Sequence, residues 1–234
     1  MKNKIVGIHQ PNYIPWLGYF YKIYESDTFV FLEDVQFSNQ GAHHYHYIKT
    51  PQGSMRLKIP VEFKFKDQIN QVRTKDELNW KKDHLNKIQL NYKKAKYFDE
   101  IYTDFSEVLS KDYKSLSEQN IEIIKYFAEK LGIVGRKYIL SSDLNINTKR
   151  GEKVLDICEK LGAGVYMSGT GAKVYQTDDD FSERNIKLEY SKFHPVTYNQ
   201  LWSDEFLTNV SIIDFLMNYG YDWDFVLQKL KKNE

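Results

Sequence analysis

The residues best suited to chemistry lie in one loop near the amino terminus. Residues 5–8 form an apolar run with the composition of a buried strand, and His9, Gln10, Asn12 and Tyr13 follow it closely. These four side chains bring several hydrogen-bond donors and acceptors, and one group that titrates near neutral pH, into a short segment. Loops at the carboxyl end of a first parallel strand hold the ligand sites of many α/β proteins. The pattern therefore predicts a polar binding site in this loop.

Within this loop, His9 is the strongest candidate for a general base. Its imidazole stands at the mouth of the predicted strand among polar neighbours, where it could take a proton from an attacking group. The competing interpretation is a structural histidine that ties the loop to backbone carbonyls. Two prolines stiffen the segment, and Gly18 allows either close helix packing or the approach of a ligand.

Two further candidates follow the second predicted strand, residues 28–32. Asp34 is a second candidate for catalysis and Gln36 a candidate for binding substrate, because the carboxyl ends of parallel strands meet at one edge of a sheet. An aspartate that opens a loop is also a common turn or cap residue, so a structural role for Asp34 stays open.

A second loop of small residues follows the strand predicted at residues 164–168. Ser168, Gly169 and Lys173 offer a hydroxyl, backbone donors and an ammonium group, which together suit a phosphate. The spacing of an NTPase phosphate loop or of a dinucleotide-binding loop is absent here. If this strand lies beside the strand at residues 5–8, the two loops form one shared site.

Three histidines stand close together in the segment His43-His44-Tyr45-His46. On an extended chain only His44 and His46 share a face, and no carboxylate or cysteine has the spacing that would complete a zinc site. We therefore predict a polar loop that faces a ligand or solvent, and no metal ion. Cys158, the single cysteine, stands at helical spacing from apolar residues and is predicted to pack in the core.

Charge and hydropathy indicate which partners and which location to expect for this protein. The chain has 234 residues, with 33 Lys and Arg against 32 Asp and Glu and a net charge of +1. Such a balance provides no field that would gather nucleic acid or an anionic membrane surface, although an aminoacyl-tRNA donor stays open. No apolar run has the form of a signal peptide or the length of a membrane helix, so a cytoplasmic location is expected.

The predicted elements alternate between strands and helices at both ends of the chain, with helices in the middle. Strands are predicted at residues 5–8, 28–32, 137–141 and 164–168, with an edge or half-exposed strand at 56–63. Helices are predicted at residues 19–24, 79–94, 97–109, 116–131, 150–161, 211–219 and 223–231. The strand, helix, strand order at residues 137–168 favours a right-handed crossover. The prediction is a single α/β domain over residues 1–234, with a mainly parallel, Rossmann-like sheet and a helical insertion at about residues 79–131.

The segments HQPNYIPWLGYFYKI and FVFLEDVQFS resemble the opening of the WbqC-like family, which occurs in bacterial surface-polysaccharide gene clusters. Later parts are similar as well, namely Trp80, residues 162–169, Tyr175 and residues 210–220. The resemblance spans nearly the whole chain and implies transfer of glycine onto an amino sugar during O-antigen synthesis. Trp16 and Tyr175 stand in the similar segments and join the predicted substrate-binding residues. After Gln36 the chain departs from the family, because the histidine segment replaces an expected Arg and Asn.

The leading functional prediction is an acyl- or aminoacyltransferase that acts on a nucleotide-linked amino sugar. His9 would deprotonate the sugar amine, Asn12 and Gln36 would orient the sugar, and the loop that starts at Ser168 would hold phosphate. An activated acyl or aminoacyl donor is expected, and neither a metal nor a covalent enzyme intermediate.

Two other interpretations stay open. The first segment has the outline of a nucleotidyltransferase signature, in which Trp16-Leu17-Gly18-Tyr19 takes the place of an H-x-G-H motif. ATP would then activate an amino acid before the amine attacks, although the missing histidines weigh against this role. A non-catalytic protein that binds sugar nucleotides or glycans is the third interpretation, supported by the 18 Tyr and 4 Trp.

Overall fold

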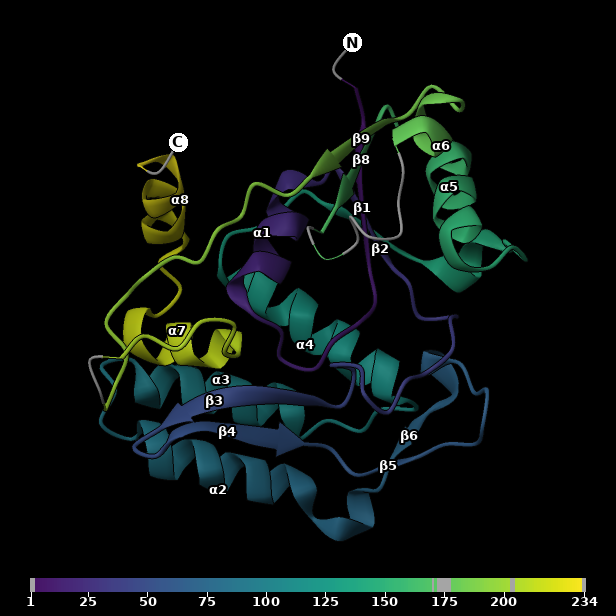
Figure 1. Cartoon of the computed structure of the whole chain (residues 1–234). Helices are drawn as coiled ribbons and strands as arrows, with labels where there is room; N and C mark the ends of the chain where they lie inside the picture. Colours follow the sequence, from purple (N-terminus) through teal and green to yellow (C-terminus); the bar gives the residue numbers. More distant parts are fainter. Residues whose placement is uncertain (1–2, 170, 172–177, 203–204, 233–234) are drawn as a thin grey trace.

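The computed structural model describes residues 3–169, 171, 178–202 and 205–232. A five-stranded parallel sheet lies at its centre (Figure 1). Across the sheet the strands are β7 (Lys137–Leu140), β2 (Thr28–Phe31), β1 (Ile5–His9), β8 (Val165–Ser168) and β9 (Lys187–Tyr190). The predicted α/β fold with a mainly parallel sheet is confirmed. The first strand pairs directly with β8, as the shared-site argument requires.

The order of these strands creates a crevice. From one edge of the sheet to the other, the strands are the third, second, first, fourth and fifth in chain order. The chain therefore passes from β1 to a neighbour on one side, β2, and from β8 to a neighbour on the opposite side, β9. This is the order of a Rossmann-like, doubly wound sheet. At the point of reversal the connections after two neighbouring strands diverge, which leaves room for a ligand at their carboxyl ends.

Each face of the sheet buries its own core, because successive strand side chains point to opposite faces. Phe29 and Phe31 of β2 belong to the larger core with residues of α1 (Leu17–Glu25) and α4 (Leu116–Lys130). Val30 belongs to the smaller core with residues of α5 (Arg150–Lys160) and α6 (Asp178–Ser182). Cys158 of α5 is fully buried in this smaller core, so its predicted packing role is confirmed.

The chain between β2 and α4 builds a second layer below the sheet (Figure 1). Its elements are β3 (Tyr45–Thr50), β4 (Gly53–Lys58), β5 (Val61–Glu62), η1 (Ile69–Gln71), β6 (Arg73–Thr74), η2 (Asp76–Leu78), α2 (Trp80–Tyr92) and α3 (Phe98–Leu109). The edge or half-exposed strand predicted at residues 56–63 is confirmed in part: Pro60 divides it into the end of β4 and β5, and neither strand joins the central sheet. The helices predicted at 79–94, 97–109 and 116–131 correspond to α2, α3 and α4. Of these, α4 is also the helix that leads the chain into β7.

The carboxyl-terminal helices close the larger core. α7 (Ile212–Tyr219) and α8 (Trp223–Lys231) lie where the sequence predicts helices, and the Tyr97 amide donates to the Met217 carbonyl at 3.1 Å to join α7 to the start of α3. A short helix, η3 (Ser141–Leu144), follows β7. Within the described ranges, no helix has the length and apolar character needed to cross a membrane.

The histidine segment is buried, which corrects the prediction of a polar loop that faces a ligand or solvent. His43, His44 and His46 are 2%, 0% and 6% exposed, because β3 and the loop before it lie beneath the amino-terminal loop. Burial lowers the pKa of each of these imidazoles to about 4. The described residues contain no group of three or more His, Cys, Asp or Glu side chains that could hold a metal ion.

Candidate functional site

A cavity of about 400 Å³ opens at the carboxyl ends of β1 and β8, the switch point of the sheet. Six of the predicted site residues line it: His9, Gln10, Trp16, Gly18, Ser168 and Gly169. The first four extend from the last residue of β1 to the first turn of α1, and the last two stand at the end of β8 and directly after it. Parallel pairing of β1 with β8 is what brings these two distant parts of the chain to one site.

The His9 imidazole lies against the aromatic wall of this switch-point cavity. Its ring centroid is 4.6 Å from that of Tyr19 and 5.8 Å from that of Trp16, and Nδ1 lies 3.0 Å from the Gln10 carbonyl oxygen. A carbonyl can only accept, so Nδ1 bears the proton and Nε2 is an acceptor. Burial, with a smaller contribution from the charge of Lys22, lowers the pKa of His9 to about 3. His9 is therefore a neutral imidazole at pH 7 and a weak proton acceptor.

Lys22 is one of the cavity residues that the sequence did not predict, together with Tyr19 and Phe193. It stands on α1 with 4% of its surface exposed, and its Nζ donates to the Ile8 carbonyl at 2.7 Å. Nζ also lies 5.8 Å from the centre of the Tyr166 ring. In the described part of the chain no carboxylate forms an ion pair with it, and burial lowers its pKa to about 7. At neutral pH Lys22 thus exists in both its protonated and its neutral form.

A signal for Lys22 was present in the sequence. Four residues separate it from Gly18, so both lie on one face of α1, and its neighbours Tyr19, Phe20 and Ile23 are apolar and buried. A lysine inside an apolar helix face is rarely buried without a function, whereas most lysines extend to solvent.

Gly18 lets two aromatic rings close over the cavity. A Cβ at this position would stand 2.7 Å from Cδ1 of Phe193 and 2.7 Å from Nε1 of Trp16. Both rings line the same cavity, so the absence of a side chain at Gly18 decides how near they approach α1. Trp16 also stacks on His46, with ring centroids 6.2 Å apart.

The end of β8 forms the opposite wall of the switch-point cavity. Ser168 is buried, its Oγ lies 3.4 Å from the Gly169 carbonyl oxygen, and its own carbonyl accepts from the Ser191 amide at 2.8 Å. The predicted residues Lys173 and Tyr175 lie outside the described residues. The described part of this loop therefore supplies a hydroxyl and small residues to the site.

Two predicted residues of the first loop lie elsewhere. Tyr13 is fully buried, with its hydroxyl 2.9 Å from Nδ1 of His84, and it packs in the larger core. Asn12 is 5% exposed and does not line the cavity. After Gln10 the chain turns toward the second layer, where the Tyr13 amide donates to the Ala42 carbonyl at 3.0 Å. This turn removes both side chains from the switch point.

Asp34 and Gln36 are also absent from the lining of the cavity. The Asp34 carboxylate accepts from Lys153 Nζ at 2.7 Å and from Ser141 Oγ at 2.5 Å, so it joins the loop after β2 to α5 and η3. Gln36 is exposed and bridges to Gln68 in the second layer. Asp34 is held by Ser141 after β7 and by Lys153, and Gln36 by the second layer, so neither side chain joins His9 at the cavity.

Comparison with known proteins identifies the family of the chain. The model of the WbqC-like protein family matches residues 10–223, a range that includes Lys22 and every lining residue of the cavity except Ile8 and His9. The chain belongs to the WbqC-like family. An uncharacterized protein of Mycobacterium tuberculosis, Rv1507c, is 32% identical over 221 residues, which is 93% of this chain and 94% of that protein. No solved structure matches the chain. The similarity of the WbqC-like chain to this relative therefore spans nearly its whole length rather than one motif.

Proposed function

We propose that the switch-point cavity binds a nucleotide-linked amino sugar and that the protein transfers an acyl or aminoacyl group, such as glycyl, to the amine of that sugar. The observation that supports this most is the buried Lys22, which lines the cavity and has no carboxylate partner in the described part of the chain. Burial of an amine without an ion-pair partner costs stability, so a functional role would explain why it is retained here. A cytoplasmic location and an activated acyl or aminoacyl donor are part of the proposal.

The proposed reaction needs one proton acceptor. The lone pair of the sugar nitrogen attacks the carbonyl carbon of the donor, the new C–N bond forms, and the bond from that carbon to the leaving group breaks with its electron pair. The proton lost by the nitrogen passes to Nζ of neutral Lys22. A base whose pKa lies near the working pH is the most effective, and the pKa of Lys22 is about 7. We therefore assign the base to Lys22 rather than to His9, whose pKa is about 3.

The other residues of the cavity would bind the substrate. The rings of Trp16, Tyr19 and Phe193 offer apolar faces for a sugar or a base, and Nε2 of His9 can accept a hydrogen bond from the sugar. Ser168 and Gly169 stand where a parallel sheet presents phosphate-binding groups. Asp34, bound to Lys153, is left to stabilise the loop after β2.

The alternative that uses ATP is less favoured by the geometry. The hydroxyl of Tyr19, at the place of the second histidine of a nucleotidyltransferase signature, donates to the Gln10 carbonyl at 3.0 Å and is not free for phosphate. Trp16, at the place of the first, stacks on His46.

Binding and turnover with matched ligands test the proposal. A nucleoside-diphosphate-linked 4-amino sugar is compared by calorimetry with its 4-hydroxy counterpart, and amide formation is then followed by mass spectrometry with acyl thioester, aminoacyl ester and ATP plus glycine as donors. We expect both sugar nucleotides to bind and only the amino sugar to gain the mass of the acyl group. Binding without turnover in any donor mixture would favour the non-catalytic interpretation, and turnover that requires ATP would favour the second enzymatic one.

A further inference from the structure

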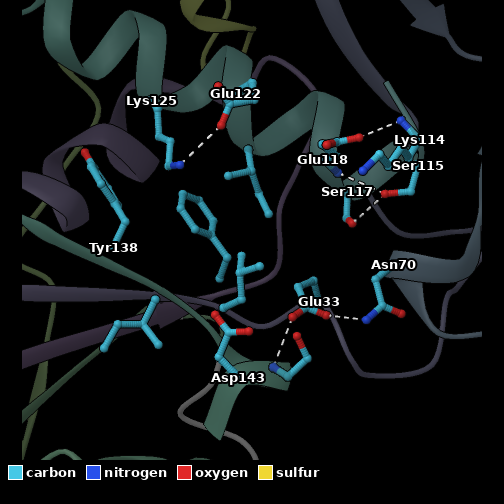
Figure 2. A pocket seen from close by; sticks show the side chains of 15 residues that line it. Glu33, Asn70, Lys114, Ser115, Ser117, Glu118, Glu122, Lys125, Tyr138 and Asp143 are labelled. Atoms are coloured by element: carbon cyan, nitrogen blue, oxygen red, sulfur yellow. Dashed lines mark hydrogen bonds and ion pairs between the residues drawn. The ribbon is translucent and has the colours of Figure 1, made fainter. Parts of the chain in front are cut away.

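A second cavity, of about 470 Å³, lies between α4 and the carboxyl ends of β2 and β7 (Figure 2). Phe31, Ile121 and Leu140 form an apolar floor, and the polar groups gather around it. Its volume is within the range of small-molecule sites. This cavity shares no lining residue with the switch-point cavity.

Negative charge predominates around this second cavity. Its lining includes the carboxylates of Glu33, Glu118, Glu122 and Asp143 and the ammonium groups of Lys114 and Lys125. Lys125 pairs with Glu122 at 3.2 Å. No side-chain ion pair compensates Glu33, Glu118 or Asp143 in the described part of the chain, so the site has an excess of acceptors for a cation.

Glu33 is the buried member of this set. It is 2% exposed, and its two carboxylate oxygens accept from the Ser142 amide at 3.0 Å and from Nδ2 of Asn70 at 2.6 Å. Both donors are neutral, and burial raises the pKa of the carboxyl group. The other amide atom of Asn70, Oδ1, is buried without a hydrogen-bond partner. Figure 2 shows Glu33 and Asn70 side by side, with Nδ2 of Asn70 toward the Glu33 carboxylate.

We propose that this second cavity binds a ligand with a primary ammonium group on an apolar body. An ammonium group has three donors and no acceptor, which suits a cavity lined by the buried carboxylate of Glu33 and by the carboxylates of Glu118 and Asp143. The apolar body of the ligand would cover Phe31, Ile121 and Leu140. The proposal does not rest on the transferase function assigned to the switch-point cavity.

Three probes of one shape and different charge test the ligand class. Phenethylamine, 2-phenylethanol and phenylacetate are titrated by calorimetry at pH 7.5. We expect phenethylamine to bind at least tenfold more tightly than the alcohol, and phenylacetate to bind most weakly. Equal affinity for the amine and the alcohol would overturn the proposal.

Substitutions in the lining of the second cavity test whether the amine binds there. Glu33→Gln keeps the shape and the acceptor for Ser142 and is expected to remove the preference for the amine, whereas Glu129→Gln, on the exposed side of α4, is expected to retain it. Glu118→Gln/Asp143→Asn changes only side chains with solvent access, and this variant is expected to weaken the preference several-fold even if Glu33→Gln does not fold. An unchanged preference in the double variant overturns the proposal.

The position of the ligand is read from methyl resonances. Phenethylamine is expected to shift those of Ile121, Ile139 and Leu140 and not that of Ile8, which lines the switch-point cavity. Lys22→Met is expected to bind phenethylamine as the unmodified protein does. Failure of the transferase proposal and failure of this one are therefore distinguishable. A shift confined to Ile8 would refute the second site.

Discussion

Lys22 donates from Nζ to the main-chain carbonyl of Ile8 at 2.7 Å, so helix α1 is joined to strand β1 directly beneath the switch-point cavity. This hydrogen bond holds the titratable amine of Lys22 against Ile8, the residue before His9. The strand order of the parallel sheet reverses at this point. The chemistry proposed for this cavity therefore depends on a buried side chain.

Replacement of Lys22 by methionine is expected to reduce amide formation by about 10² to 10⁴, the usual contribution of one general base. Stability should be unchanged or greater, since an apolar side chain of similar length replaces a buried amine that has no ion-pair partner. Turnover and thermal unfolding are measured together, with Lys82→Met on the exposed side of α2 as the matched control. Full activity in Lys22→Met would exclude this residue as the base.

His9→Gln is expected to lower turnover by less than about tenfold, because a group with a pKa of about 3 accepts protons poorly at neutral pH. Glutamine retains a side-chain acceptor for the sugar. The pH profile of kcat/KM should keep its lower limb near pH 7, the value set by Lys22. A fall of more than about 10² together with loss of that limb would return the base to His9.

Asp34→Asn is expected to act on stability rather than on chemistry. The side chains of Lys153 and Asp34 are 6% and 13% exposed, so removal of one charge leaves the other buried and unpaired. A loss of about 3 to 5 kcal/mol is typical of such a change. Chemical unfolding of Asp34→Asn, Lys153→Met and the double variant gives the coupling energy between them. Purely additive effects, or loss of turnover in folded Asp34→Asn, would contradict this role.

Gly18→Ala is expected to cost about 1 to 3 kcal/mol, the range for overpacking, because the new methyl group would meet Phe193 and Trp16. Binding of the sugar nucleotide should weaken as these two rings move. Gly151→Ala in α5 is the control, since a Cβ there meets nothing within 4 Å and alanine favours a helix. Equal stability changes in the two variants would show that the contact at Gly18 is unimportant.

The free energy of unfolding is expected to fall as the pH decreases from 6.5 toward 4. Burial lowers the pKa of His43, His46 and His84 to about 4, so between these pH values the unfolded chain binds more protons than the folded one. Each histidine then removes about 1.4 kcal/mol per pH unit. Glu33 and Asp214, whose pKa burial raises, oppose this trend at the acid end. Urea unfolding at pH 7.5, 6 and 5 measures the slope, which His46→Gln should reduce.

The position of most helices and strands of the sheet follows from the sequence alone. Hydrophobic periodicity and the residues that end a helix act over a few positions, so α2, α3, α7 and α8 can be predicted within a residue or two. The strand, helix, strand order at residues 137–168 favours a parallel sheet, but it does not fix the neighbours, because β8 pairs with β1 and not with β7, the strand before it in the chain. These features predicted six residues of the switch-point cavity.

Contacts between distant parts of the chain decided the rest. Tyr13 leaves the site because its partner His84 is 71 residues away, and Asp34 is bound by Lys153, 119 residues away. The burial of Lys22 and of the histidine segment likewise depends on which element covers them, and no local pattern records that. The sequence shows which titratable groups are available for chemistry. Burial and the charges brought near by folding set the pKa of each group, so only the tertiary structure decides which of them can transfer protons near neutral pH.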